Sequence, residues 1–164
     1  MAKTIGNVLV GVALIEVKYP IGGSYVELGY TKDGVQVEYS AEEADIEVEE
    51  ESFPIQSVIT KEKAAIICNV AEASLYNLDK AIPGSVYAGN VITIGDGLIK
   101  EMSVRVTGKN PAGFNRTIEC PLCVASGDAV ALNHRKGEAQ VVACKFKVLK
   151  AQGADPFKVT DSTS

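Results

Sequence analysis

Alternation of apolar and polar residues with a period of two recurs along this 164-residue chain, and it restricts the fold more than any other feature. The clearest runs are 35–39, 102–107 and 142–148. Successive residues of a strand point to opposite faces, so such runs predict strands with one buried and one solvated face. In the last run, Lys145 and Lys147 are expected to point outward. The pattern predicts a mainly β fold.

Further strands and turns are predicted between these runs. Two Asp-Gly signals, at Asp33-Gly34 and at 95–97, indicate hairpin turns because glycine accepts the positive φ that such turns need. A break is expected at 40–44 and a turn at 133–138. With these runs included, the predicted strands are 5–17, 25–28, 35–39, 45–49, 91–94, 98–107, 114–125 and 140–149.

One segment, 60–82, has a helical period instead. Its apolar residues recur at three- and four-residue steps, Thr60 is a suitable N-cap, and Pro83 and Gly84 are expected to end the helix. The pattern predicts one amphipathic helix of about 20 residues. Its core face is expected to hold Ile67, Ala71, Leu75 and Leu78.

The length of the chain indicates one domain, since domains commonly have about 100–150 residues. We expect that domain to span 1–150, followed by a flexible or partner-ordered tail at 151–164, which is small, polar and broken by proline. No apolar run reaches the roughly 18 residues that span a membrane. A secretory signal is also not expected, which favours synthesis in a reducing cytosol.

Charge is distributed unevenly along the chain. Residues 1–51 hold three Lys and eleven Asp or Glu, a balance of −8, while the rest balances at +3, giving the net −5. Asp45, Glu47 and Glu49 are predicted to share one face of a strand. The acidic third is either a solvated face or one half of a head-to-tail contact between copies. The net negative charge argues against binding of a nucleic-acid backbone.

The sequence contains little material for catalysis. His134 is the only histidine and is expected to be solvated in a turn, and neither a nucleophile elbow nor a glycine-rich phosphate loop is present. No enzyme activity, cofactor or metal is therefore expected. Cys120 and Cys123 have the spacing of half a zinc site, but Cys68 and Cys144 form no second close pair, so ordinary buried thiols are predicted. A stand-alone metal-binding module remains the alternative.

The order of several short signals resembles the major tail (tail tube) proteins of tailed bacteriophages. The alternating acidic strand at 45–49 is one of these signals, and the cysteines are not among them. The others are LGYTKDGV at 28–35, FPI at 53–55, AEASLYNL at 71–78, RTIECP at 116–121 and DPF at 155–157.

This resemblance implies a β-sandwich or half-barrel with one flanking helix. It further implies a virion structural protein, made in the bacterial host cytoplasm, whose homohexameric rings stack into the tube of a long, non-contractile tail. Expected partners are other copies, the tape-measure protein and the tail terminator and initiator proteins, while genomic DNA passes through the lumen without specific binding. Asp45, Glu47 and Glu49 are then expected to face the lumen or the adjoining subunit. The alternatives are a capsid decoration protein and the inner tube protein of a contractile injection system.

Overall fold

The computed structural model describes residues 13–29, 31–95, 97–110, 112–127, 136–137 and 141–163. Within these residues the mainly β architecture with one helix is confirmed, and the paired strands are antiparallel. Most of the predicted strand 5–17, most of the turn at 133–138 and His134 lie outside the described residues. The elements are β1 (Leu14–Lys18), β2 (Tyr25–Glu27), β3 (Thr31–Ile46), β4 (Gln56–Val70), α1 (Leu75–Ala81), β5 (Ser85–Ala88), β6 (Val91–Ile94), β7 (Glu101–Lys109), β8 (Asn115–Ala125), β9 (Val142–Val148) and β10 (Lys158–Asp161).

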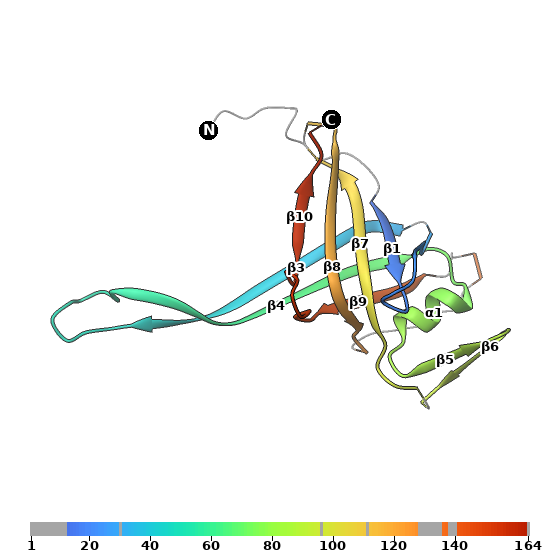
Figure 1. Ribbon diagram of the computed structural model, residues 1–164, viewed down its shortest axis with the longest axis horizontal. Coiled ribbons are helices and arrows are strands. Elements are labelled where there is room, and N and C mark those ends of the chain that lie inside the picture. The colour runs from blue at the N-terminus through green and yellow to red at the C-terminus, as the bar shows by residue number, and fades with distance from the viewer. Residues whose placement is uncertain are drawn as a thin grey trace.

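One large sheet forms the body of the protein, with the strand order β2-β1-β7-β8-β9-β4-β3 and with β10 paired to β8. The sheet is strongly bent, so that β3, β4 and β9 cross behind β7 and β8 in Figure 1. The bend brings β3 close to β1 from the other end of the sheet, and the Thr31 hydroxyl donates to the Ala13 carbonyl at 3.4 Å.

The concave side of this sheet encloses the hydrophobic core. The predicted alternation in 142–148 is confirmed, because Val142, Cys144 and Phe146 are buried while Lys147 is exposed. Ser103 was expected to point outward but is buried, and its hydroxyl donates to the Pro121 carbonyl at 2.7 Å. The other buried apolar residues of the core are Ile15, Val17, Leu28, Ile66, Cys68, Val70, Leu78, Ala81, Met102, Val104, Val106, Cys120 and Cys123.

The predicted helix over 60–82 is wrong for its first half. Residues 60–70 belong to β4, so neither Ile67 nor Ala71 lies on a helix. Ile66, Cys68 and Val70 alternate into the core, and hydrogen bonding to β3 and β9 on both sides outweighs the helical spacing read from the sequence.

The helix itself is short. Its N-cap is Ser74, whose hydroxyl accepts a hydrogen bond from the Asn77 amide at 3.2 Å, and it ends before Pro83 and Gly84 as expected. Leu78 is buried in the core and Leu75 packs against it, as predicted. The side-chain amide of Asn77 donates to the carbonyls of Leu28 and Glu72 at 2.7 and 2.8 Å and so fastens α1 to the body.

Neither predicted hairpin turn closes a hairpin. At Asp33-Gly34 the chain continues through β3, and the glycine's positive φ of 78° serves a register shift between Lys32 and Val35. The break expected at 40–44 is likewise part of β3. Near the second signal, β6 pairs with β5 rather than with β7, and the two-residue turn that closes this pair is Gly89-Asn90.

The C-terminal segment, predicted to be flexible or ordered by a partner, contains β10. This strand pairs with the first half of β8 in the same chain, from Lys158↔Glu119 to Asp161↔Arg116. Arg116 donates two hydrogen bonds to the carboxylate of Asp161, at 2.6 and 2.8 Å, which lowers the pKa of Asp161.

Candidate assembly surface

A two-stranded projection extends from the body and is the most unusual feature of the chain (Figure 1). It consists of the outer parts of β3 and β4 and the loop between them, residues 42–61, which we call the arm. Every residue of the arm is exposed, whereas β4 becomes buried from Ala65 onward, where it also pairs with β9. The arm is therefore ordered by its own two strands and not by packing on the body.

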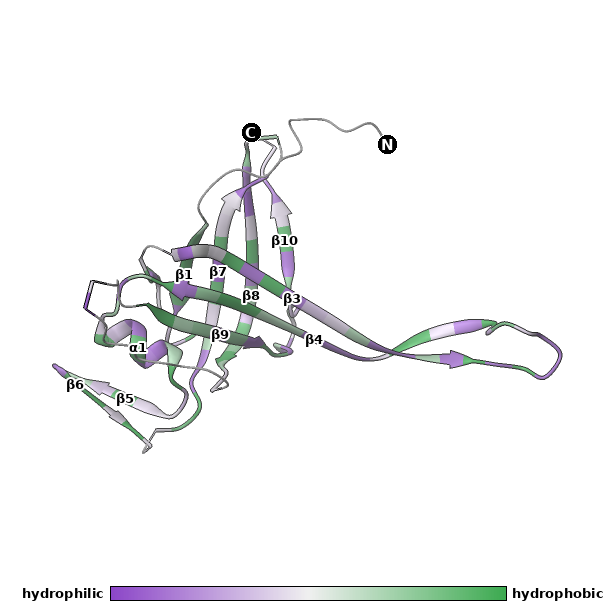
Figure 2. Cartoon of the chain, turned by 180° about the vertical axis from the view of Figure 1, so that it is seen from behind, coloured by the Kyte–Doolittle hydropathy of each residue, from purple (hydrophilic) through white to green (hydrophobic). Residues whose placement is uncertain are grey.

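The arm carries apolar side chains that are exposed in the described part of the chain. Phe53, at its tip, is 80% exposed. Figure 2 shows hydrophobic segments on the arm interspersed with hydrophilic ones. Several large apolar side chains exposed on one projection are common at interaction sites. The exposed large apolar residues of the arm are Ile46, Val48, Phe53, Ile55, Val58 and Ile59.

The same arm carries most of the acidic excess of the protein. It holds seven carboxylates and one lysine, a balance of −6, so the rest of the chain balances at +1. Asp45 lies at the outer end of β3, and Glu47 and Glu49 lie in the tip loop, all three exposed. The predicted strand 45–49 thus ends at Ile46, but the three carboxylates do lie on one projection.

Thr60 has a different role from the N-cap predicted for it. Its hydroxyl donates to the Glu42 carbonyl at 3.1 Å, beside the register shift between Glu42 and Glu43. This hydrogen bond helps hold the bulge where the arm leaves the body.

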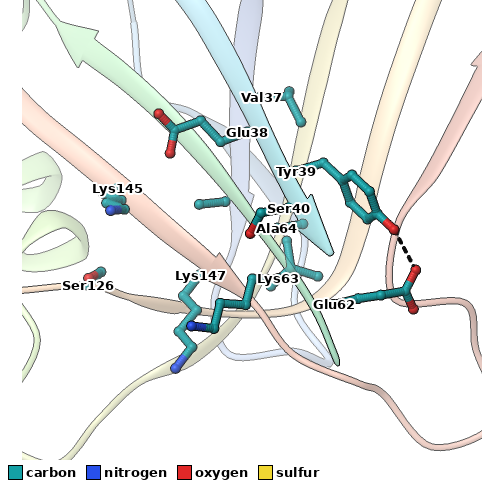
Figure 3. A pocket seen from close by; sticks show the side chains of 12 residues that line it. Val37, Glu38, Tyr39, Ser40, Glu62, Lys63, Ala64, Ser126, Lys145 and Lys147 are labelled. Atoms are coloured by element: carbon teal, nitrogen blue, oxygen red, sulfur yellow. Dashed lines mark hydrogen bonds between the residues drawn. The ribbon is translucent and has the colours of Figure 1, made fainter. Parts of the chain in front are cut away.

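A groove of about 800 Å³ lies where the arm joins the body, and we call it the root groove (Figure 3). Lys63, Lys145 and Lys147 line it together with Glu38 and Glu62, for a balance of +1. On its arm side, the Tyr39 hydroxyl donates to Glu62 at 2.7 Å, which raises the pKa of Tyr39. Apart from the exposed ring of Tyr39, its apolar lining consists of small or partly covered side chains such as Ala64, Ala65 and Val148.

A second exposed apolar surface lies at the opposite end of the molecule from the arm, on β5, β6 and the segment before β7 (Figure 1). Leu98 is 88% exposed. A pocket of about 650 Å³ opens on this surface. Its lining includes Val86, Leu98 and Ile99 together with Tyr19, Lys80 and Lys100. We call this surface the far-end patch, and its exposed large apolar residues are Val86, Tyr87, Val91, Ile94, Leu98 and Ile99.

A buried polar cluster forms the base of that pocket. Asp79 pairs with Lys100 at 2.7 Å and with Lys80 at 2.8 Å, and it accepts a hydrogen bond from the Ser85 hydroxyl at 2.9 Å. Burial acts to raise the pKa of Asp79, but these hydrogen bonds together hold it below its ordinary value. Lys80 also lies over the ring of Tyr19 at 4.2 Å. The Lys100 ammonium also donates to the Ser85 hydroxyl at 2.8 Å, so Ser85, Asp79 and Lys100 form one hydrogen-bonded cluster.

The four cysteines are free and buried, which confirms the prediction of buried thiols. Cys120 and Cys123 share the core face although they are three residues apart, because β8 holds one extra residue between the pairs Met102↔Cys123 and Val104↔Cys120. Hydrogen bonding to Cys120 and burial raise the pKa of Cys123, so its thiol stays protonated. Among the described residues, no group of three or more His, Cys, Asp or Glu is arranged to hold a metal ion.

Sequence reasoning located the acidic residues but missed both apolar surfaces. The far-end patch has a signal in the sequence, because Leu98 and Ile99 are adjacent apolar residues that interrupt the alternation leading into β7. No helix in the described part of the chain is long and apolar enough to cross a membrane. Comparison of the chain with protein-family models finds no matching family, and comparison with curated protein sequences finds no matching protein.

Proposed function

We propose that this protein is a self-assembling structural subunit of the phage tail tube type, whose copies form hexameric rings that stack into a tube for genome delivery. In this proposal it works in the virion, without catalysis, alongside a tape-measure protein and the proteins that begin and end the tube. The resemblance of its short signals to tail tube proteins supplies the class of assembly.

The observation that carries the proposal is the arm. A projection without buried residues loses backbone conformational entropy on ordering and gains little from burial in the monomer. Two-stranded hairpins are marginally stable in water by themselves. The arm also exposes unpaired strand edges and six large apolar side chains, the usual ingredients of pairing with another chain. A second copy that covers the arm would supply the missing burial.

The charge of the arm fits the same proposal. Seven carboxylates on one projection repel DNA, so an arm that faces a lumen lets the genome slide rather than adhere. An arm that faces a neighbouring subunit instead meets the remainder of that chain, which is slightly positive. Both positions are compatible with Asp45, Glu47 and Glu49 acting in assembly or in passage of the genome.

The experiment is light scattering and negative-stain electron microscopy over a concentration series, on the full chain and on a variant with a short arm. In that variant, Asn-Gly replaces residues 44–58, because this dipeptide closes a two-residue hairpin between the partners Glu43 and Ile59. The full chain is expected to form rings with six-fold symmetry or hollow tubes. The short-arm variant is expected to stay monomeric with an unchanged circular dichroism spectrum and unfolding midpoint for the body.

Other outcomes separate the alternatives. A compact trimer of the full chain would favour a capsid decoration protein. Hexameric rings from the short-arm variant would contradict the role of the arm. A full chain that remains monomeric at every concentration, also in the presence of preformed phage tail initiator complexes, would overturn the proposal.

A further inference from the structure

Exposed apolar side chains are concentrated in two places on the molecule. Of the eighteen large apolar residues that are exposed in the described part of the chain, six lie on the arm and six on the far-end patch. The two surfaces lie at opposite ends of the long axis (Figure 1). The arm is the outer, two-stranded part of the β3–β4 pair, and the far-end patch is built around the two-stranded sheet β5–β6.

We propose that the arm tip of one copy, led by Phe53, docks on the far-end patch of a second copy. This inference rests on the proposed self-assembly and names the two surfaces that meet. A contact between opposite ends is heterologous, so each added copy presents a new arm and a new patch, and the contact either closes into a ring or propagates.

Electrostatics selects this pairing over an arm–arm contact. Each arm has a balance of −6, so two arms placed face to face would repel each other. The pocket in the far-end patch has two lysines, Lys80 and Lys100, against the single carboxylate of Asp79. Its residual positive charge suits a tip that carries Glu47, Glu49 and the two glutamates that follow.

Shape and apolar content select the far-end patch over the root groove. Phe53 is the largest exposed side chain of the arm, and the pocket of about 650 Å³ has Val86, Leu98 and Ile99 in its walls. The root groove has a comparable charge but lacks large exposed aliphatic side chains. A patch–patch contact would bury the far ends of two copies but leave both arms uncovered.

Cross-linking between separately purified variants tests the pairing. Ser52→Cys places a thiol beside Phe53, and Leu98→Cys places one on the patch. A short bis-maleimide should join these two chains into a heterodimer when they are mixed. The four native cysteines are buried and should not react, which the unmodified chain controls. Ser52→Cys mixed with Val159→Cys, an exposed position on β10, gives the background.

Two alanine substitutions give an independent test of the contact. Phe53→Ala should weaken association about 30-fold if it is the anchor of the contact. Phe114→Ala removes a partly exposed phenylalanine outside both surfaces and should leave association unchanged.

The remaining outcomes overturn the inference. Cross-linking of Ser52→Cys to Lys147→Cys would place the arm in the root groove, and cross-linking of Leu98→Cys to itself would indicate a patch–patch contact. Rings or tubes in the microscope without the Ser52–Leu98 product would reject this pairing while the proposed function stands. If no variant or unmodified chain assembles and no product exceeds background, both proposals fail.

Discussion

The body and the arm of this protein share two strands, β3 and β4, yet these strands are ordered differently in the two regions. In the body, β4 alternates buried and half-buried residues from Ala65 to Val70, and its order comes from the core. In the arm, the same strand has no buried residue. Packing within the subunit constrains the sequence of the body. The sequence of the arm is constrained instead by the surface that the arm contacts.

The largest expected difference concerns two phenylalanines. Phe146→Ala removes a side chain that is fully buried in the core and should lower the free energy of unfolding by about 3–5 kcal/mol. Phe53→Ala changes an exposed tip residue and should alter the same quantity by less than about 0.5 kcal/mol. Urea denaturation of both variants measures this contrast. Equal losses would mean that the arm packs on the body.

The second prediction concerns the ion pairs of Asp79, which lie in the body beside the far-end patch. Asp79→Asn leaves Lys80 and Lys100 without their carboxylate and should cost about 3 kcal/mol at neutral pH. The pKa of Asp79 is lowered in the folded state, so its contribution is complete above the unfolded value of 3.8 and is lost as pH falls through the lowered value. Urea titrations from pH 7 to pH 2 should therefore show the two proteins converging below about pH 4. A constant difference would contradict this assignment.

The third prediction concerns the negative charge of Glu47 on the arm. Glu47→Lys should leave the unfolding midpoint unchanged, because the side chain is exposed. It should change the concentration at which assemblies appear in light scattering, since it alters the charge of the arm by two. Asp155→Lys, at an exposed position before β10 and outside both proposed contact surfaces, is the matched charge reversal. A melted Glu47→Lys monomer would show that the arm is not solvated.

The smallest expected effect is local to the base of the arm. Thr60→Val removes the hydrogen bond to the Glu42 carbonyl and should speed amide hydrogen exchange in the arm without changing exchange in β7 or β8. Thr93→Val, at an exposed position on β6, serves as the control. Faster exchange throughout the sheet would mean that arm and body open as one unit.

The sequence predicted the elements whose order comes from local alternation and missed those set by distant partners. Strands β7, β8 and β9 were placed nearly at their observed limits, because one face of each is buried along its length. The helix over 60–82 failed in its first half because pairing with β3 and β9, distant in sequence, decides that segment.

The sequence predicts the acidic character of the candidate site but not its position in the structure. The alternation of residues 45–49 identifies the carboxylates at 45, 47 and 49, but nothing local indicates that β3 continues through Gly34 to form an arm. A glycine with positive φ permits a hairpin turn and a bulge equally well, and only the partner strand distinguishes them. The position of the far-end patch likewise depends on the bend of the sheet.

The length of the arm has a consequence for how fast copies find each other. From its base to its tip the arm extends about 30 Å, taking roughly 3.3 Å per strand residue. A subunit that offers its contact residues so far from its centre sweeps a larger volume as it tumbles, and its first productive touch does not require two bodies to meet face to face. Removing one pair of facing strand residues at a time, while keeping the tip, should lower the association rate of subunits before it changes the affinity of the finished contact.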